Sequence, residues 1–593
     1  MSPTPQPLPR RPRRADLIVA VIAVALAIWV TSALWLDPNG RAVAVNSGDQ
    51  ALFEWLLAFG GHSLVGLDNP LLTGLLNAPD QVNLAVNTSI TVLAWLFAPV
   101  TFLFGPSVSF LAILTLNLAG SAYAWYWLFQ RKLDMSPVAA GVAGIFAGFA
   151  PALVSHANSH LNWTAQWLIP LILANLMGLH RRPLRRGILL GLLVGVTFSI
   201  AAEALFFTAL AWAVFLLVWV PARRDRLGAV VKPYLKGLGI TAIVAGILLA
   251  YPLYLHFAGP QRYEGTGFDH RIHSEDVAAY GSFPKLSLAG ALGLNSDLAP
   301  NPTEENSFFG LPLLLVAIAC LILLWRLRPE RRATLRALAV TGGVFALLSF
   351  GPRIKFAGTS IDIPLPYAFL GKLPVFDAAL PARLALVVAP IIALILALAL
   401  DELPRLPAGS RRVARPVLIA GLVAGLLPLF PIQIPAVERP RVPHFISSGE
   451  WKTVVPPGGV LVPVPLPSDV LPDGQRWQAS ALAADPTGEV FTVPAGFFLG
   501  PGGPDGRGRI GPVPRPTAAL LEQVANTGEV PVVYPSMISA AQDDLAYWQA
   551  DAVVLPTRPF GRAPIHTEAL LETMTKLLGA PQRRDDVWVW QVS

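Results

Sequence analysis

Apolar runs of about 20 residues, separated by short polar links, are the feature that most restricts how this chain can fold. The first run extends from Leu17 to Leu36, and many others follow it. Roughly 20 apolar residues in a helix cross a bilayer core, where the helix also satisfies its own backbone hydrogen bonds. In agreement, 54% of the residues are hydrophobic and only 14% are charged, where a soluble protein has about 25%. The sequence therefore predicts a polytopic α-helical membrane protein.

The basic residues form short clusters between the apolar runs, and they account for the net charge of +7. Cytoplasmic loops of membrane proteins carry such clusters, so the charge does not indicate a nucleic-acid partner. Arg10, Arg11, Arg13 and Arg14 place the N-terminus in the cytoplasm. The apolar run after them is too long for a cleavable signal peptide and predicts a retained signal-anchor. The abundance of proline and glycine is typical of a GC-rich bacterial genome and favours a bacterial plasma membrane.

The alternation of apolar runs with basic clusters predicts about eleven transmembrane helices within residues 1–430. The segment 89–104 is left out of this set, because it is short and Gly105-Pro106 ends it. If 89–104 crossed, every later basic cluster would lie outside, so we predict an interfacial amphipathic helix there. Loops 37–88 and 258–309 are then extracytoplasmic. The expected spans are 16–36, 108–130, 136–154, 163–179, 187–202, 205–220, 238–257, 310–325, 334–350, 383–400 and 416–430.

Residues 431–593 differ in character from the rest and are expected to form an extracytoplasmic α/β domain. The runs GGVLVPVPLP and AVVLP read as buried strands, and DVWVWQV alternates with a period of two. TAALLEQVANTG and HTEALLETMTKLLGA read as helices that end at glycine.

Loop 37–88 is rich in acidic residues, more than a simple link between helices needs. Asp49, in NSGDQALFEW, is the first candidate for a catalytic carboxylate, although an aspartate at this point is also a good helix N-cap. Glu54 and Asp68 are candidates for substrate binding. Asp68 and Asp80 both stand beside proline-containing turns, where aspartate is common without any function.

Two histidines and one glutamate are further candidates in the membrane part. His156 and His160 in SHANSHLNW are four residues apart, so they share one face if the segment is helical, and two such histidines can bind a metal ion. The alternative is two polar groups at a helix end. Glu203 lies close to membrane depth, where ionisable residues are costly and usually functional.

Three more candidates come from the later outer segments. In loop 258–309, the stretch QRYEGTGFDHRIHSEDV mixes aromatic and polar side chains, as sugar-binding sites often do, and includes His270 and Arg271. Part of this loop is simply a solvated face. Arg383 begins an apolar helix on the outer side, where an arginine either snorkels to the interface or binds a lipid phosphate.

The layout resembles the GT-C superfamily of membrane glycosyltransferases. A first helix is followed by a large outer loop with an early acidic residue, Asp49. An interfacial segment, SITVLAWLFAPVTFLFG, then precedes a helix ending in basic residues, LNLAGSAYAWYWLFQRKL. This order looks like that of protein mannosyltransferases, aminoarabinose transferases and actinobacterial arabinosyl- and mannosyltransferases. The resemblance covers roughly residues 1–400.

The resemblance implies transfer of a hexose or pentose from a polyprenyl-phosphate donor to a cell-envelope glycan or glycolipid. Asp49 would act as general base in an inverting reaction. Arg383, His156 or a divalent cation would stabilise the leaving phosphate. The loop reads GDQ, without the paired-acid motif of some members, which leaves metal dependence open. The alternatives are a lipid-linked sugar transporter or flippase, and a non-catalytic envelope-assembly protein.

Overall fold

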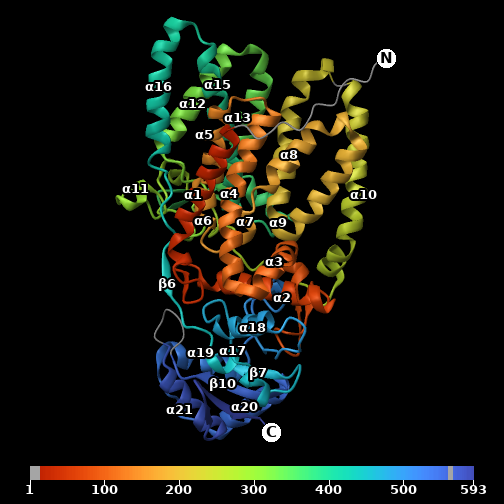
Figure 1. The fold of residues 1–593 in the computed structure, drawn as a ribbon, viewed down its shortest axis with the longest axis vertical. Coiled ribbons are helices and arrows are strands. Elements are labelled where there is room, and N and C mark those ends of the chain that lie inside the picture. The colour runs from red at the N-terminus through yellow and green to blue at the C-terminus, as the bar shows by residue number, and fades with distance from the viewer. Residues whose placement is uncertain (1–13, 227, 559–564, 593) are drawn as a thin grey trace.

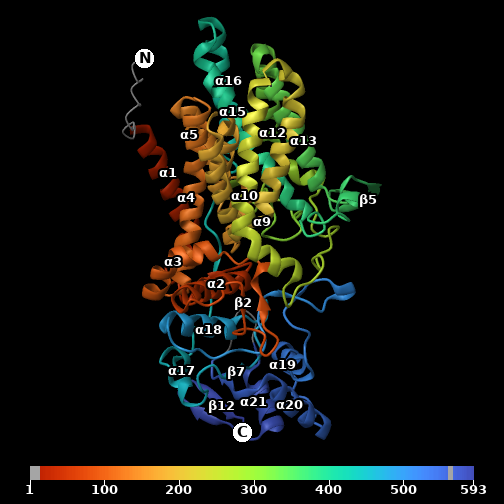
Figure 2. The same cartoon turned by 90° about the vertical axis from the view of Figure 1, so that its right-hand side faces the viewer.

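The computed structural model describes residues 14–226, 228–558 and 565–592. The molecule is elongated, with a helical bundle at one end and the C-terminal region, described over residues 431–558 and 565–592, at the other (Figures 1 and 2). Two helices, α2 (Ser47–Gly66) and α3 (Thr91–Phe104), lie between them. One continuous cluster of buried apolar side chains extends from the bundle into the C-terminal region. Of the N-terminal arginines, Arg10, Arg11 and Arg13 lie outside the described residues.

Within the described ranges, six helices are long and apolar enough to cross a membrane, and four apolar helices are shorter. The multi-pass α-helical architecture is therefore confirmed, whereas the count of about eleven spans stays a prediction. The long helices are α1 (Arg14–Trp35), α4 (Pro106–Lys132), α9 (Pro183–Trp219), α10 (Gly228–Ala258), α13 with its leading 3-10 turn (Pro329–Ser349) and α15 with its flanking 3-10 turns (Pro381–Arg405). The shorter ones are α3, α5 (Pro137–Gly148), α8 with the turn after it (Leu168–Arg181) and α12 (Leu311–Leu327).

Helix α9 consists of two arms that meet at Ala201, where φ is −150° and ψ is 70°. In the first arm, Gly187 and Gly195 pack in turn against the beginning and the middle of α10. In the second arm, Trp212 donates a hydrogen bond to Tyr234, near the start of α10. The second arm therefore runs back along α10, and the chain reverses near the boundary expected between the fifth and sixth spans.

The span expected at 136–154 is broken in the structure. Helix α5 ends at Gly148, and a separate short helix, α6 (Pro151–His156), begins at Pro151. Proline lacks an amide hydrogen and clashes with the preceding turn, so it begins a helix more readily than it continues one. A further turn, α7 (Leu161–Thr164), precedes α8. Short helical turns, rather than one helix, therefore carry the two histidines.

Helix α3 packs against α2 at the lower end of the bundle in Figure 1. Its buried side includes Ala94, which lies against Gly60 of α2. Its other side exposes Leu96, Leu103 and Phe104. A helix outside the long bundle with an exposed apolar side fits the interfacial position predicted for 89–104.

The C-terminal region is built around a four-stranded sheet in the order β11 (Gln582–Arg584), β12 (Val587–Gln591), β10 (Ala550–Pro556) and β7 (Val460–Pro463). Strands β7 and β10 are parallel, and the other pairs are antiparallel. Helices α19 (Pro516–Thr527) and α21 (Thr567–Leu578) form where the sequence predicted them. Two more, α18 (Asp473–Ala484) and α20 (Pro535–Trp548), were missed, because alanine and polar residues dominate them.

The remaining elements lie in the loops and at the ends of the bundle. Loop 258–309 carries the short helix α11 (Leu288–Ala291). An exposed hairpin of β4 (Arg353–Phe356) and β5 (Thr359–Pro364) follows α13. Helix α16 (Ala408–Leu426) projects at the end far from the C-terminal region (Figure 1).

The packing of α5 on α4 depends on glycine, and this gives a test of the bundle. A Cβ atom at Gly148 would overlap Ala122 of α4, whereas nothing lies within 4 Å of such an atom at Gly246 of α10. Alanine favours a helix by about 0.5–1 kcal/mol over glycine, but overpacking costs about 1–3 kcal/mol. We expect Gly148→Ala to lower the melting temperature of the detergent-solubilised protein, and Gly246→Ala to leave it equal or higher. Equal melting temperatures for the two variants would contradict this packing.

Candidate functional site

Asp49 lies in the first turn of α2, at the edge of the helical bundle. The N-cap of this helix is Asn46, whose side chain accepts a hydrogen bond from the Asp49 amide. The N-cap alternative for Asp49 is therefore wrong, and its carboxylate is available for other contacts. Its Oδ2 atom lies 2.6 Å from Nδ2 of Asn46 and 2.8 Å from Nε2 of His160.

The two histidines meet through the turn between α6 and α7 rather than through one helix. Helix α6 ends at His156, Ser159 adopts a left-handed backbone with φ of 86°, and His160 precedes α7. The Nδ1 atoms of the two rings lie 2.8 Å apart. His156 is buried and stacks on Trp163, with ring centroids 5.4 Å apart.

Arg383 joins two carboxylates on the other side of the histidines. Its guanidinium lies 2.7 Å from Glu304 and 2.9 Å from Glu203. The second Glu203 oxygen accepts a hydrogen bond from the Leu380 amide at 2.9 Å. The Arg383 side chain also lies over the Trp163 ring, 5.3 Å from its centroid. The kink in α9 at Ala201 places Glu203 beside Arg383. Three separate segments of the chain therefore supply Glu203, Glu304 and Arg383.

These contacts form one polar chain, here called the central cluster: Asp49, His160, His156, Glu304, Arg383 and Glu203. Burial alone would raise the pKa of Asp49, but the hydrogen bond with His160 and nearby positive charge hold it below its ordinary value. Burial alone would raise the pKa of Glu304, but the Arg383 guanidinium lowers it to about 2. Burial lowers the pKa of His156 well below its ordinary value. At pH 7, Asp49 and Glu304 are therefore carboxylates and His156 is neutral.

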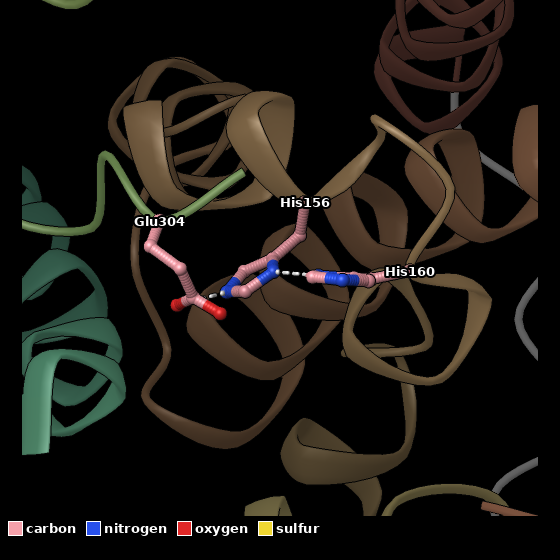
Figure 3. A group of neighbouring side chains, drawn as sticks. All are labelled: His156, His160 and Glu304. Atoms are coloured by element: carbon pink, nitrogen blue, oxygen red, sulfur yellow. Dashed lines mark hydrogen bonds and ion pairs between the residues drawn. The ribbon is translucent and has the colours of Figure 1, made fainter. Parts of the chain in front are cut away.

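One face of the central cluster has the donor atoms of a metal site (Figure 3). One ligand atom from each of His156, His160 and Glu304 lies within 4.8 Å of the others. His156 Nε2 is buried without a hydrogen-bond partner, 3.8 Å from a Glu304 oxygen. Neutral imidazole nitrogens and a carboxylate oxygen suit a divalent transition-metal ion. The residues therefore fit such an ion, and they are equally consistent with a hydrogen-bonded relay without one.

An apolar cavity of about 890 Å³ adjoins the central cluster. It follows the second arm of α9 from Ala204 to Trp219, between α4, α8, α10, α13 and α15. Trp163 lines the cavity and also contacts His156 and Arg383. Pockets of roughly 300–1,000 Å³ hold ligands in other proteins, so an apolar ligand in this cavity would end beside the polar groups.

The sequence candidates thus divide into two sets. Asp49, His156, His160, Glu203 and Arg383 come together in the central cluster. Glu304 was missed, although the run TEENS, just before an apolar span, is a detectable signal of polar groups near the membrane.

The other four candidates lie elsewhere among the described residues. Glu54 is buried in an ion pair with Arg439. Asp68 and Arg271 are exposed, and His270 contacts the carbonyl oxygen of Asp377. Their substrate-binding roles stay predictions.

The fold is similar to that of a solved membrane glycosyltransferase. A mycobacterial arabinofuranosyltransferase, AftD, superposes with a TM-score of 0.51 at 12% identity, over 95% of this chain and 38% of that protein. This chain thus spans little more than a third of its length. The apo oligosaccharyltransferase of Archaeoglobus fulgidus gives a TM-score of 0.47 at 12% identity, over 91% of this chain and 69% of that protein. The same archaeal enzyme with an inhibitory peptide and a dolichol-phosphate also gives 0.47 at 12% identity, with the same coverage of both chains.

No curated protein matches the sequence. Residues 20–424 match the family described as "Domain of unknown function (DUF6311)". This match covers more than half of the chain, including the whole central cluster, and the protein therefore belongs to the DUF6311 family.

Proposed function

We propose that this protein is a membrane glycosyltransferase that moves a sugar from a polyprenyl-phosphate donor to a cell-envelope glycan or glycolipid. The observation that carries the proposal is the meeting, at Trp163, of an apolar cavity of about 890 Å³ with a cluster that contains both a carboxylate and a guanidinium. A lipid-linked sugar needs this combination, because its tail is apolar and its reacting bond is polar. The fold occurs in an arabinofuranosyltransferase, so it accommodates this class of chemistry.

In the proposed reaction, Asp49 accepts the proton of an acceptor hydroxyl. The hydroxyl oxygen attacks the anomeric carbon, the bond from that carbon to the phosphate oxygen breaks, and the configuration inverts. The low pKa of Asp49 makes it a weak base, so it takes the proton late, when bond formation has already made the hydroxyl acidic. The hydrogen bond between Asp49 and His160, at 2.8 Å, holds the carboxylate in one orientation.

The charge balance of the central cluster favours a bound cation. Leaving the histidines aside, Asp49, Glu203 and Glu304 supply three carboxylates, and Arg383 is the single guanidinium in the cluster. A phosphate leaving group would be repelled by this excess of negative charge. A divalent ion held by His156, His160 and Glu304 would reverse the local charge and stabilise the phosphate oxygens.

The basic ends of the helices support an orientation with the central cluster and C-terminal region outside the cytoplasm. Arg131 and Lys132 end α4, and Arg181 follows α8, as the positive-inside rule requires for cytoplasmic ends. Nucleotide sugars are absent outside the cytoplasm, so a donor reaching an external site would be lipid-linked.

Asp49→Asn tests the proposal most directly. The amide cannot accept the proton, so we expect transfer in membranes supplied with labelled polyprenyl-phosphate sugars to fall by roughly 10²–10⁴-fold. The matched control is Asp80→Asn, because Asp80 is exposed in the same loop and its carboxylate accepts a hydrogen bond from Tyr547 of the C-terminal region. Full activity of Asp49→Asn would exclude this mechanism, and lipid-linked sugar transport by that variant would favour the transporter alternative.

Removal of divalent cations tests the charge argument. We expect a chelator to abolish transfer by the wild-type protein and a divalent transition metal to restore it. Direct metal-binding measurements should show weaker binding for His160→Ala and Glu304→Gln than for wild type. Undiminished transfer after chelation, in a protein shown to be metal-free, would favour the relay of hydrogen bonds instead.

Site-directed labelling tests the orientation. Cys320 is the single cysteine and is buried, so a Cys320→Ser background is suitable. Glu529, in the C-terminal region, and Ser410, at the start of α16, are both exposed. We expect a membrane-impermeant maleimide to label Glu529→Cys in intact cells and Ser410→Cys only after lysis. The opposite labelling pattern would contradict this orientation.

A further inference from the structure

The C-terminal region touches the first turn of α2 directly. Gly48, which precedes Asp49, packs so closely on the carbonyl oxygen of Asp469 that a Cβ atom at position 48 would overlap it. Further along the same helix, Trp55 donates a 2.7 Å hydrogen bond to Gln478 of α18. One side of α2 therefore faces the C-terminal region, while Asp49 faces His160 on the other side.

Arg439 makes the strongest connection between α2 and the chain that enters the C-terminal region. Its two terminal nitrogens contact the two oxygens of Glu54 at 2.8 and 3.1 Å. It also donates to the carbonyl oxygen of Pro38 at 3.0 Å and to Oγ of Ser107 at 2.9 Å. The side chains of Arg439 and Glu54 are 6% and 2% exposed. Arg439 thus joins the outer loop, α2 and the start of α4 in a dry environment.

Further hydrogen bonds connect the Arg439–Glu54 pair with the first turn of α2, which contains Asp49. Gln50 donates to Glu54 at 2.8 Å and accepts from the Val43 amide at 2.8 Å. Val43 belongs to β1 (Arg41–Val43), which pairs with β6 (Ala436–Glu438) just before Arg439. The pairing of β1 with β6 and the ion pair of Arg439 with Glu54 therefore both hold the N-terminal half of α2.

We propose that Arg439 is a positioning residue for Asp49, through which the C-terminal region sets the placement of the catalytic helix; this rests on the proposed function. A buried ion pair adds little net stability, but removing or misaligning one partner is costly. Any sliding or rotation of α2 would break the two-point contact of Arg439 with Glu54. The position of Asp49, five residues earlier on the same helix, is therefore held against displacement.

The test compares Arg439→Lys with Arg441→Lys. Lysine keeps the charge at 439 but cannot make the two-point contact. Arg441 is a matched control, because it lies two residues away and its pair with Asp37 is exposed. A displacement of about 1 Å can cost roughly 10²-fold in rate. We expect Arg439→Lys to lower kcat by about 10- to 100-fold with little change in the donor KM, and Arg441→Lys to change neither.

The distribution of hydrogen exchange separates positioning from a general loss of structure. Positioning predicts faster exchange confined to α2 in Arg439→Lys, whereas a general loss of structure would raise exchange throughout the chain.

Hydrogen exchange keeps this inference separate from the proposed function. In the full-length proteins, residues 47–60 should exchange faster in Arg439→Lys than in Arg441→Lys. If the wild-type protein transfers sugar from no donor, the proposed function is wrong. Hydrogen exchange would still show whether Arg439 holds α2. Transfer by wild type, with kcat and exchange unchanged in Arg439→Lys, would overturn the positioning role. If Arg439→Lys does not fold, Gly48→Ala, which presses the first turn away from Asp469, is expected to lower kcat in the same way, and unchanged kcat there would overturn the inference.

Discussion

The structure depends on charges that are buried together near the end of the bundle that faces the C-terminal region. Arg383 lies between Glu203 and Glu304, and the histidine pair continues this contact to Asp49. An unpaired charge in such a place would cost several kcal/mol, so each of the contributing segments must adopt its observed path. The reversal of α9, the broken helix after α5 and the loop before α12 are all consistent with this requirement. The polar cluster therefore constrains the paths of the segments that supply its residues.

The apolar cavity and the cluster are two consequences of the same arrangement. The second arm of α9 turns back along α10, and the space it leaves is lined by apolar side chains from several helices. Trp163 stands at the boundary, with one set of contacts to His156 and Arg383 and another to the cavity. An amphipathic ligand with a long apolar tail would be held by both regions at once. This is the physical basis for the lipid-linked donor in the proposed function.

The outer loop between α1 and α4 is held from two sides. The histidine segment contacts Asn46 and Asp49, since Ser159 donates to the Asn46 carbonyl at 2.7 Å. The C-terminal region contacts Gly48, Glu54 and Trp55. Under the proposed function, α2 carries the reacting carboxylate and must be held within a fraction of an ångström. The C-terminal region supplies part of the contacts that hold it.

The sequence by itself determined the membrane class, and it picked out five of the six residues that meet in the central cluster. Long apolar runs and charged residues near membrane depth can be recognised in a short stretch of sequence. The turn residues before α2 can be recognised in the same way. Only the tertiary structure decided the partners. Glu54 and Asp49 look alike in the sequence, yet one pairs with Arg439, some 385 residues away, and the other with His160. Glu304 was not predicted, because the contact that distinguishes it from other acidic residues is with Arg383, which is distant in the chain. Burial and pairing are properties of segments brought together by folding, and no local pattern encodes them.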